Sequence, residues 1–175
     1  MIKTIEDLHE AIQYYGFLPL FKNDIPNFSV EELCDPSLWF AKDVEGPWEW
    51  KGVVIQDRQS AYGKFFNHKA GFVSKKWLRD FLNYRRDGYD LDARFDDGLA
   101  SYQDLELYNF INEHQPITTK QLKLKIEYKE STLNRLQMQT YIIIEDFVLK
   151  SFSKFMYVKP SYLLSFVLDI YLFVL

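Results

Sequence analysis

The sequence has one cysteine and none of the short motifs that usually mark a nucleotide or metal site. Cys34 cannot form an intramolecular disulfide, so we expect a reduced thiol and a cytoplasmic protein. No Walker loop, GxGxxG, GxSxG or HExxH motif occurs, and the three histidines lie far apart in the sequence. These absences predict a protein that works without a metal ion or an organic cofactor.

A hydrophobic run long enough to span a bilayer is also missing. The longest apolar stretch, residues 162–175, is shorter than the roughly 20 residues that a membrane helix needs, and it contains Asp169. We therefore expect a buried strand or helix there, and no membrane span. The alternative is an apolar tail, residues 151–175, that docks a protein partner.

Positive charge is scarce overall but concentrated in two places. The formal net charge is -4, which argues against a protein that coats nucleic acid over its whole surface. Cations nevertheless dominate residues 48–86 and 120–135, where phosphates could be bound, although a solvated helix face carries similar charges. The candidate nucleic-acid-binding residues are Lys64, Lys69, Arg79, Arg85, Arg86, Lys120, Lys123, Lys125, Lys129 and Arg135.

The first part of the chain, residues 1–103, is predicted to form a small α+β domain. Thr4 and Asp7 form a capping-box pair for a first helix, which Gly16 ends. Two runs rich in β-forming residues, 48–55 and 60–73, predict a hairpin with a polar turn at residues 56–59 and a second turn at 67–69. Ser74 then begins an amphipathic helix.

The second part, residues 104–150, follows a different order. Capping residues predict three short helices, and residues 141–148 are almost all β-formers. This is the order of a winged helix, whose third helix enters the major groove of DNA; a helical subdomain packed on the first part is the alternative. The turn of the wing would fall at residues 150–154. The predicted fold class is α+β, with a winged-helix-like unit after the N-terminal domain.

Two sets of side chains are candidates for chemistry on a nucleic acid. Gln137 and Gln139 flank Met138 at the end of the third predicted helix, where two amides could project side by side into a cleft. Trp48, Trp50 and Tyr62 are candidates for stacking on bases. Surface glutamines and core aromatics are the simpler interpretations.

Five blocks of the sequence resemble a known bacterial family. They read WEWK at 48–51, AYGKFF at 61–66, KAGFVS at 69–74, NYRRDGYD at 83–90 and LQMQTY at 136–141. Together they are similar to the short AlkZ-related proteins, relatives of the AlkZ and YcaQ DNA glycosylases, which are built from winged helices and excise alkylated or crosslinked purines. The resemblance implies DNA as the partner and DNA repair as the process. It also implies that Gln137 and Gln139 match the Gln-aliphatic-Gln motif that handles the catalytic water.

The resemblance leaves three functions open. The first is a catalytically silent winged-helix DNA-binding protein, because this chain has room for about one winged helix and carries its amide motif late. The second is an active N-glycosylase that hydrolyses N7-alkylated or crosslinked purines. A cationic N7-alkylated base is already activated as a leaving group, so neutral amides that position a water would suffice. The third is a protein-interaction module that does not bind nucleic acid.

Overall fold

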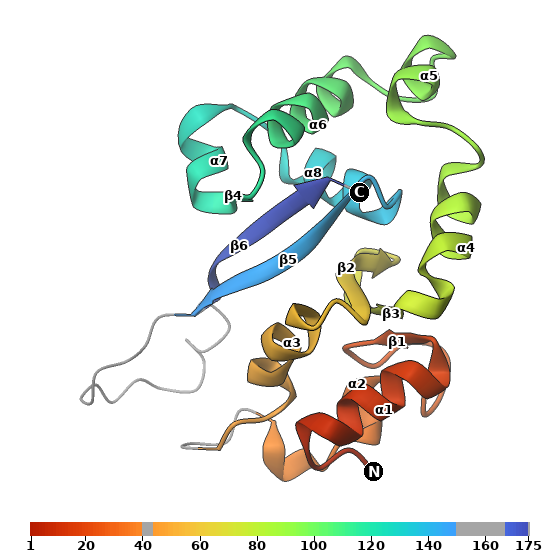
Figure 1. Ribbon diagram of the computed structural model, residues 1–175, viewed down its shortest axis with the longest axis vertical. Helices are drawn as coiled ribbons and strands as arrows, with labels where there is room; N and C mark the ends of the chain where they lie inside the picture. The colour runs from red at the N-terminus through yellow and green to blue at the C-terminus, as the bar shows by residue number, and fades with distance from the viewer. Residues whose placement is uncertain (40–43, 150–166, 175) are drawn as a thin grey trace.

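The computed structural model describes residues 1–39, 44–149 and 167–174 (Figure 1). Its first helix begins as predicted, because Thr4 and Asp7 form a reciprocal capping box, and it ends at Gly16 with φ 76°. The elements of the first half are α1 (Ile5–Tyr15), β1 (Phe17–Pro19), α2 (Val30–Leu33), a 3₁₀ turn (Pro36–Leu38), α3 (Pro47–Gln56), β2 (Ser60–Phe66), β3 (Lys69–Ser74) and α4 (Lys75–Arg86).

The prediction of a strand over residues 48–55 is wrong, because this segment is the helix α3. Pro47 occupies the first helical turn, and the Glu49 carboxylate accepts the main-chain N–H of Gly46 at 3.0 Å. Trp50 and Val54 lie four residues apart and are both buried. The start signals and this buried face therefore outweigh the β preference of the Val-Val-Ile run.

The hairpin is formed by β2 and β3, and not around the first predicted turn at residues 56–59. Strands β2 and β3 pair antiparallel around Asn67 and His68, which both have positive φ, so the turn predicted at residues 67–69 is confirmed. Residues 56–59 instead lead from α3 into β2. Strand β1 pairs with the other edge of β3.

Three helices followed by a strand occupy the second half, as the capping pattern predicts. Thr118 and Gln121 form the expected capping box, whereas the first of the three helices begins at Ser101 rather than Asp104 and the last at Lys129 rather than Ser131. The elements are α5 (Leu91–Asp96), α6 (Tyr102–His114), β4 (Ile117–Thr118), α7 (Thr119–Lys125), α8 (Glu130–Met138), β5 (Ile142–Leu149) and β6 (Val167–Val174).

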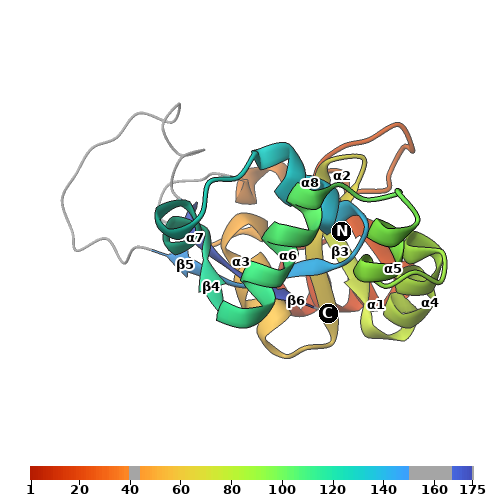
Figure 2. The same cartoon turned by 90° about the horizontal axis from the view of Figure 1, so that it is seen from above.

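The six strands found in the described residues belong to one sheet, with the order β1-β3-β2-β5-β6-β4. Each neighbouring pair is antiparallel, and β2 meets β5 through the single pairing of Tyr62 with Ile144. Helices α6 and α8 lie beside β5 and β6, while α1 and α3 lie beside the N-terminal strands (Figures 1 and 2). The molecule has an α+β fold, and the predicted boundary between two units near residue 103 stays a prediction.

The apolar C-terminal segment supplies a strand, one of the two structures predicted for it. Strand β6 lies between β5 and β4, and Leu172 is fully buried. Residues 162–166 and the turn expected at 150–154 lie outside the described residues. In the part of the chain that the structure describes, no helix has the length and apolar character needed to cross a membrane.

Lys51 is the unexpected member of the core. It is only 2% exposed, and its ammonium group donates a hydrogen bond to the main-chain oxygen of Trp48. The Nζ atom lies 3.5 Å from the ring centroid of Trp48 and 4.8 Å from that of Phe147, so two aromatic faces partly replace water around the charge. Burial lowers the pKa of Lys51 to about 8, against a small opposing effect of Glu49.

Replacing Lys51 by Met should therefore change how stability depends on pH. The folded-state pKa lies below the unfolded-state value of about 10.4, so the wild type gains stability as pH rises through the window between the two values. Lys51→Met removes the buried charge and this gain. We expect the variant to be equal to or more stable than the wild type by about 1–3 kcal/mol near pH 7, with the difference shrinking towards about pH 10. Urea unfolding of both proteins across this range measures it, and a difference independent of pH would contradict the assignment.

Shortening Leu172 should show that β6 belongs to the core. Leu172→Ala removes a fully buried side chain, and we expect a loss of about 2–5 kcal/mol of unfolding free energy. Leu124→Ala is the matched control, because Leu124 is 79% exposed and its truncation should change stability by less than about 0.5 kcal/mol. Equal effects in chemical denaturation would mean that β6 is not packed as described.

Candidate functional site

Gln137, one of the two predicted catalytic amides, is buried at the contact between α8 and β2. It is 1% exposed, and its Oε1 atom accepts the main-chain N–H of Lys64 at 3.1 Å. The β2–β3 register shifts between Gly63 and Phe66, so the strand ladder is interrupted there. The amide of Gln137 therefore serves a main-chain donor that the irregular strand leaves without a regular partner.

Gln139 occupies a different position. It is half-buried and forms the C-cap of α8, where its own N–H donates to the main-chain oxygen of Arg135 at 2.9 Å. Residues two apart on a helix do not share a face. The structure thus gives no support to the expectation that Gln137 and Gln139 project side by side into one cleft.

Three of the predicted phosphate-binding cations converge on the same region as Gln137. Lys64 Nζ donates to Asn134 Oδ1 at 2.8 Å, and Arg85 Nη2 donates to the main-chain oxygen of Phe65 at 2.8 Å. Arg86 Nη2 donates to the main-chain oxygen of Thr140 at 2.7 Å, and its guanidinium lies 4.9 Å from the Tyr141 ring centroid. We call Lys64, Arg85, Arg86, Asn134 and Gln137 the β2–α8 junction.

The junction is cationic but directed inward. Lys64, Arg85 and Arg86 are all half-buried, and each donates to a neutral acceptor of the protein. Within the described ranges, the ion pairs include neither Lys64 nor Arg85. Burial lowers the pKa of Arg86, as expected for a guanidinium partly removed from water. Lys64 and Arg85 thus tie α8 and the end of α4 to β2, and Arg86 ties the end of α4 to the residue that follows Gln139.

Sequence reasoning missed Asn134 as a member of this cluster. It lies three residues before Gln137 and so on the same face of α8. The sequence did contain a signal for this contact. Asn134 and Gln137 are two amides three residues apart on a helix whose Leu133 and Leu136 face the core, a spacing that indicates a second surface of contact.

The other predicted cations are divided among separate places. Arg135 is paired with the buried Asp104 at 2.6 Å; burial raises the pKa of this carboxyl, but hydrogen bonds from Arg135 and Ser101 outweigh it and lower the pKa. Lys69 is exposed and donates to the main-chain oxygen of Lys22 at 3.0 Å, and Arg79 is exposed on α4. The remaining lysines, all exposed on α7 or just before α8, are Lys120, Lys123, Lys125 and Lys129.

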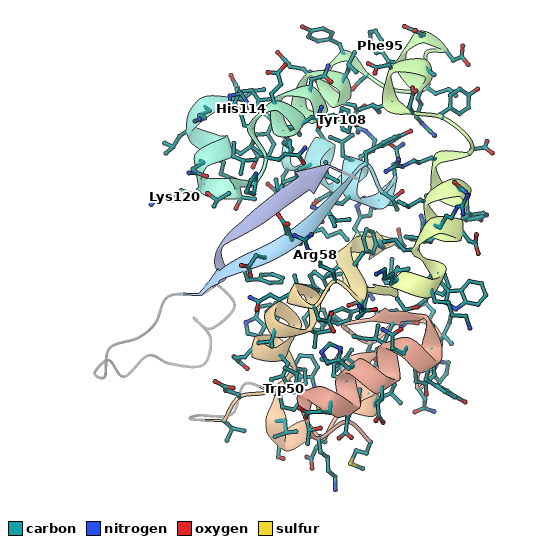
Figure 3. All side chains as sticks on the ribbon, in the orientation of Figure 1. Trp50, Arg58, Phe95, Tyr108, His114 and Lys120 are labelled. Atoms are coloured by element: carbon teal, nitrogen blue, oxygen red, sulfur yellow. The ribbon has the colours of Figure 1, made fainter. Side chains whose placement is uncertain are left out.

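The exposed cations do not form one surface. Helices α4 and α7 lie at opposite sides of the molecule in both views (Figures 1 and 2), and Figure 3 labels Lys120 in the first turn of α7. A nucleic acid that contacts the lysines of α7 therefore follows a different face from one that contacts Arg79.

The predicted base-stacking residues lie mainly in the core. Trp50 is 8% and Tyr62 3% exposed, and the Tyr62 ring packs 4.9 Å from that of Phe72. Burial raises the pKa of Tyr62. Trp48 is half-buried with the Lys51 ammonium over its ring, and Trp50 lies where α3 approaches α1 (Figure 3). Trp50 and Tyr62 hence have no ring face available for a base.

One cavity lies away from the junction. It has a volume of about 650 Å³ and is lined by the end of α3, the start of β2, the start of α4, Pro116 and part of β5. Arg58 and Glu145, which form an ion pair at 3.4 Å, are among the lining residues. None of the predicted site residues is among the described residues that line it. In the same described part of the chain, no cluster of three or more His, Cys, Asp or Glu residues could hold a metal ion.

One comparison with known proteins gave a match. The model of a family described as AlkZ related matches residues 2–154, which is most of the chain and ends before β6. No curated protein and no solved structure matched significantly.

Exchanging each glutamine for Met should separate their roles. Gln137→Met keeps the size of the side chain but leaves the buried N–H of Lys64 without its acceptor, so we expect a loss of about 1–3 kcal/mol of unfolding free energy. Gln139→Met is the matched control, with an expected change below about 0.5 kcal/mol. Chemical denaturation of the two variants compares them. A Gln137→Met variant as stable as the wild type would show that the amide is not a structural tie.

Proposed function

The chain belongs to the AlkZ-related family, and from this membership we propose that it is a DNA-binding protein related to DNA-repair glycosylases, without a working amide pair. The observation that carries the second half of this proposal is the position of Gln137. To position a water for attack on a sugar carbon, an amide needs an oxygen that solvent can reach. The Gln137 oxygen is buried and already accepts the Lys64 N–H.

A winged-helix unit is the scaffold we infer for DNA binding. From α6 onward the elements follow the order helix, strand, helix, helix, strand, strand, and β6 lies between β5 and β4. This sequence of elements and this strand arrangement support a winged helix in which α8 is the third helix. The residues that connect β5 to β6, where the wing would be, lie outside the described residues.

The third helix is largely occupied by the protein itself. Asn134 and Gln137 contact β2, Arg135 pairs with Asp104 of α6, and Leu133 and Leu136 face the core. Deep insertion of α8 into a major groove would require these contacts to break. We therefore propose that DNA is held mainly through its phosphates.

The phosphate-binding surface we propose consists of the exposed lysines Lys120, Lys123, Lys125 and Lys129. Lys123 and Lys125 lie in the last turn of α7, and Lys129 is the N-cap of α8. Flexible ammonium groups suit binding to phosphates that does not depend on sequence. Such binding weakens steeply with salt because bound counterions are released from DNA.

An active N-glycosylase is the second candidate, and the observation that favours it is the position of the Gln139 amide. This amide is half-buried at the end of α8 and not tied to β2 by any hydrogen bond of the described residues. A protein-interaction module is less well supported, because β6, which comes from the apolar segment expected to dock a partner, is built into the sheet: it pairs with β5 and, at Tyr171 and Leu172, with β4.

Charge reversal on α7 tests the DNA-binding proposal. We expect wild-type protein to bind a short labelled duplex at low salt and to lose affinity steeply between about 50 and 200 mM salt. Lys123→Glu/Lys125→Glu should weaken binding about tenfold or more and reduce the salt slope by about 2, if both lysines contact phosphates. Lys3→Glu/Lys22→Glu, a change of equal charge at exposed positions on α1's side of the molecule, is the control. Equal loss in both variants, or no binding by the wild type, would overturn the proposal.

An excision assay decides between the silent and the active form. On duplex DNA that carries N7-methylguanine, we expect no release of the base above the protein-free rate. Release by the wild type that is abolished in Gln139→Ala, with DNA affinity retained, would establish the glycosylase alternative.

A further inference from the structure

We propose that the outer face of α4 is a second nucleic-acid site, which binds a single strand by stacking unpaired bases on Tyr84 and Trp77. This inference rests on the proposed DNA-binding function and adds to it a surface that recognises unpaired bases. It uses neither the lysines of α7 nor the β2–α8 junction.

The first argument is the concentration of charge on α4. The helix carries Lys75, Lys76, Arg79, Arg85 and Arg86 against one carboxylate, Asp80, in a chain whose net charge is -4. Arg85 and Arg86 point inward to main-chain oxygens, whereas Lys75, Lys76 and Arg79 are exposed. The ion pairs found among the described residues involve none of these three exposed cations. Lys75 and Arg79 are each two residues from Trp77, so they lie on the other flank of the exposed side, and Asp80 lies between Trp77 and Tyr84. The exposed side of α4 as a whole carries three cations against this one carboxylate, and that excess attracts a polyanion.

The second argument is the pair of exposed aromatic rings on the same helix. Tyr84 is 81% and Trp77 41% exposed. They lie seven residues apart, so they share a face and are separated by about 10 Å along the helix axis. Every base has a ring face that can stack on an aromatic side chain, which makes such a surface tolerant of sequence.

The third argument is that the Trp77 ring is held in place on one side. It packs against Gly16, where an added Cβ atom would lie 2.4 Å from Trp77 Cδ1, and its centroid is 5.9 Å from that of Phe17. Only glycine leaves room for this close approach. The Nζ atom of Lys76 lies 5.8 Å from the same centroid. A ring fixed in this way loses little conformational entropy when a base stacks on it.

The composition of this face favours a nucleic acid over a protein partner. The aliphatic side chains of α4 turn inward: Leu78 and Leu82 are half-buried and Phe81 is 7% exposed. What remains outside is three cations, the two rings, Asn83 and the single carboxylate of Asp80, without the contiguous apolar patch that a protein interface usually needs. Cations for phosphates and rings for bases are the combination that single-strand binding requires.

The location of α4 makes the site separate from the duplex surface. The helix forms one outer side of the molecule, and α7 lies on the other (Figures 1 and 2). A duplex bound along α7 and a single strand bound along α4 would therefore contact different faces of one protein.

Conservative and drastic changes at Tyr84 provide the test. The probe is a labelled oligothymidylate of about 15 nucleotides, followed by fluorescence anisotropy at low salt. We expect Tyr84→Ala to weaken binding about 5- to 100-fold and Tyr84→Phe to preserve it, because stacking needs the ring but not the hydroxyl. Lys76→Glu/Arg79→Glu should weaken binding further and flatten its salt dependence. Tyr102→Ala, which removes a 66% exposed tyrosine of α6, is the matched control.

The outcomes separate this inference from the proposed function. Equal affinities for the oligonucleotide in Tyr84→Ala, Tyr102→Ala and the wild type would overturn the α4 site. So would binding that depends on Lys123 and Lys125 but not on α4. If duplex binding requires α7 and the oligonucleotide does not bind, the α4 site is wrong while the proposed function stands. Failure to bind either probe would overturn both. Thermal melting of Tyr84→Ala at the wild-type temperature confirms that a loss of affinity is not a loss of fold.

Discussion

The contact between β2 and α8 is the constraint on which the rest of this structure depends. The sheet continues from its N-terminal to its C-terminal strands through one pairing, Tyr62 with Ile144. Side chains hold the two halves of the sheet together instead. The Gln137 oxygen accepts the main-chain N–H of Lys64, and the Lys64 ammonium group donates to the Asn134 oxygen. One hydrophobic cluster crosses it, from Leu8 of α1 to Leu133 of α8. The surface of α8 that a free winged helix could offer to DNA is thereby used to hold the fold together.

Local signals predicted the second half of the molecule better than the first. The capping box of Thr118 with Gln121 and the break before Pro116 lie where the helices begin and end. Periodicity and capping therefore predicted that the helices exist, although two of their start positions were off by two or three residues. Helix α3 was misread because Val53, Val54 and Ile55 favour a strand, although Pro47 and Glu49 mark a helix start. A strand propensity is mostly a packing preference, and the packing of this segment is decided by distant elements.

The candidate site could be predicted as a set of residue types but not as an arrangement. The sequence shows that Gln137 is an amide near a helix end, but its partner is the N–H of Lys64, which is distant in sequence and available only because β2 is irregular. Likewise, the presence of a lysine or arginine in the sequence does not reveal whether its charged group points to solvent or into the protein. Arg85 and Arg86 donate inward to carbonyls, and Lys51 is enclosed by aromatic rings, while the neighbouring Lys75 and Lys76 remain in solvent.

The position of β6 within the sheet determines when this fold can be completed on the ribosome. The strand lies between β5 and β4, and Ile117 of β4 pairs with Leu172 of β6. The edges of β4 and β5 that face β6 therefore have no strand to pair with until β6 has been synthesised. Long-range closure of this kind is slow, and unpaired edges are the surfaces through which nascent chains associate. The speed of translation through β6 and the supply of chaperones that cover these edges thus become determinants of the yield of folded protein.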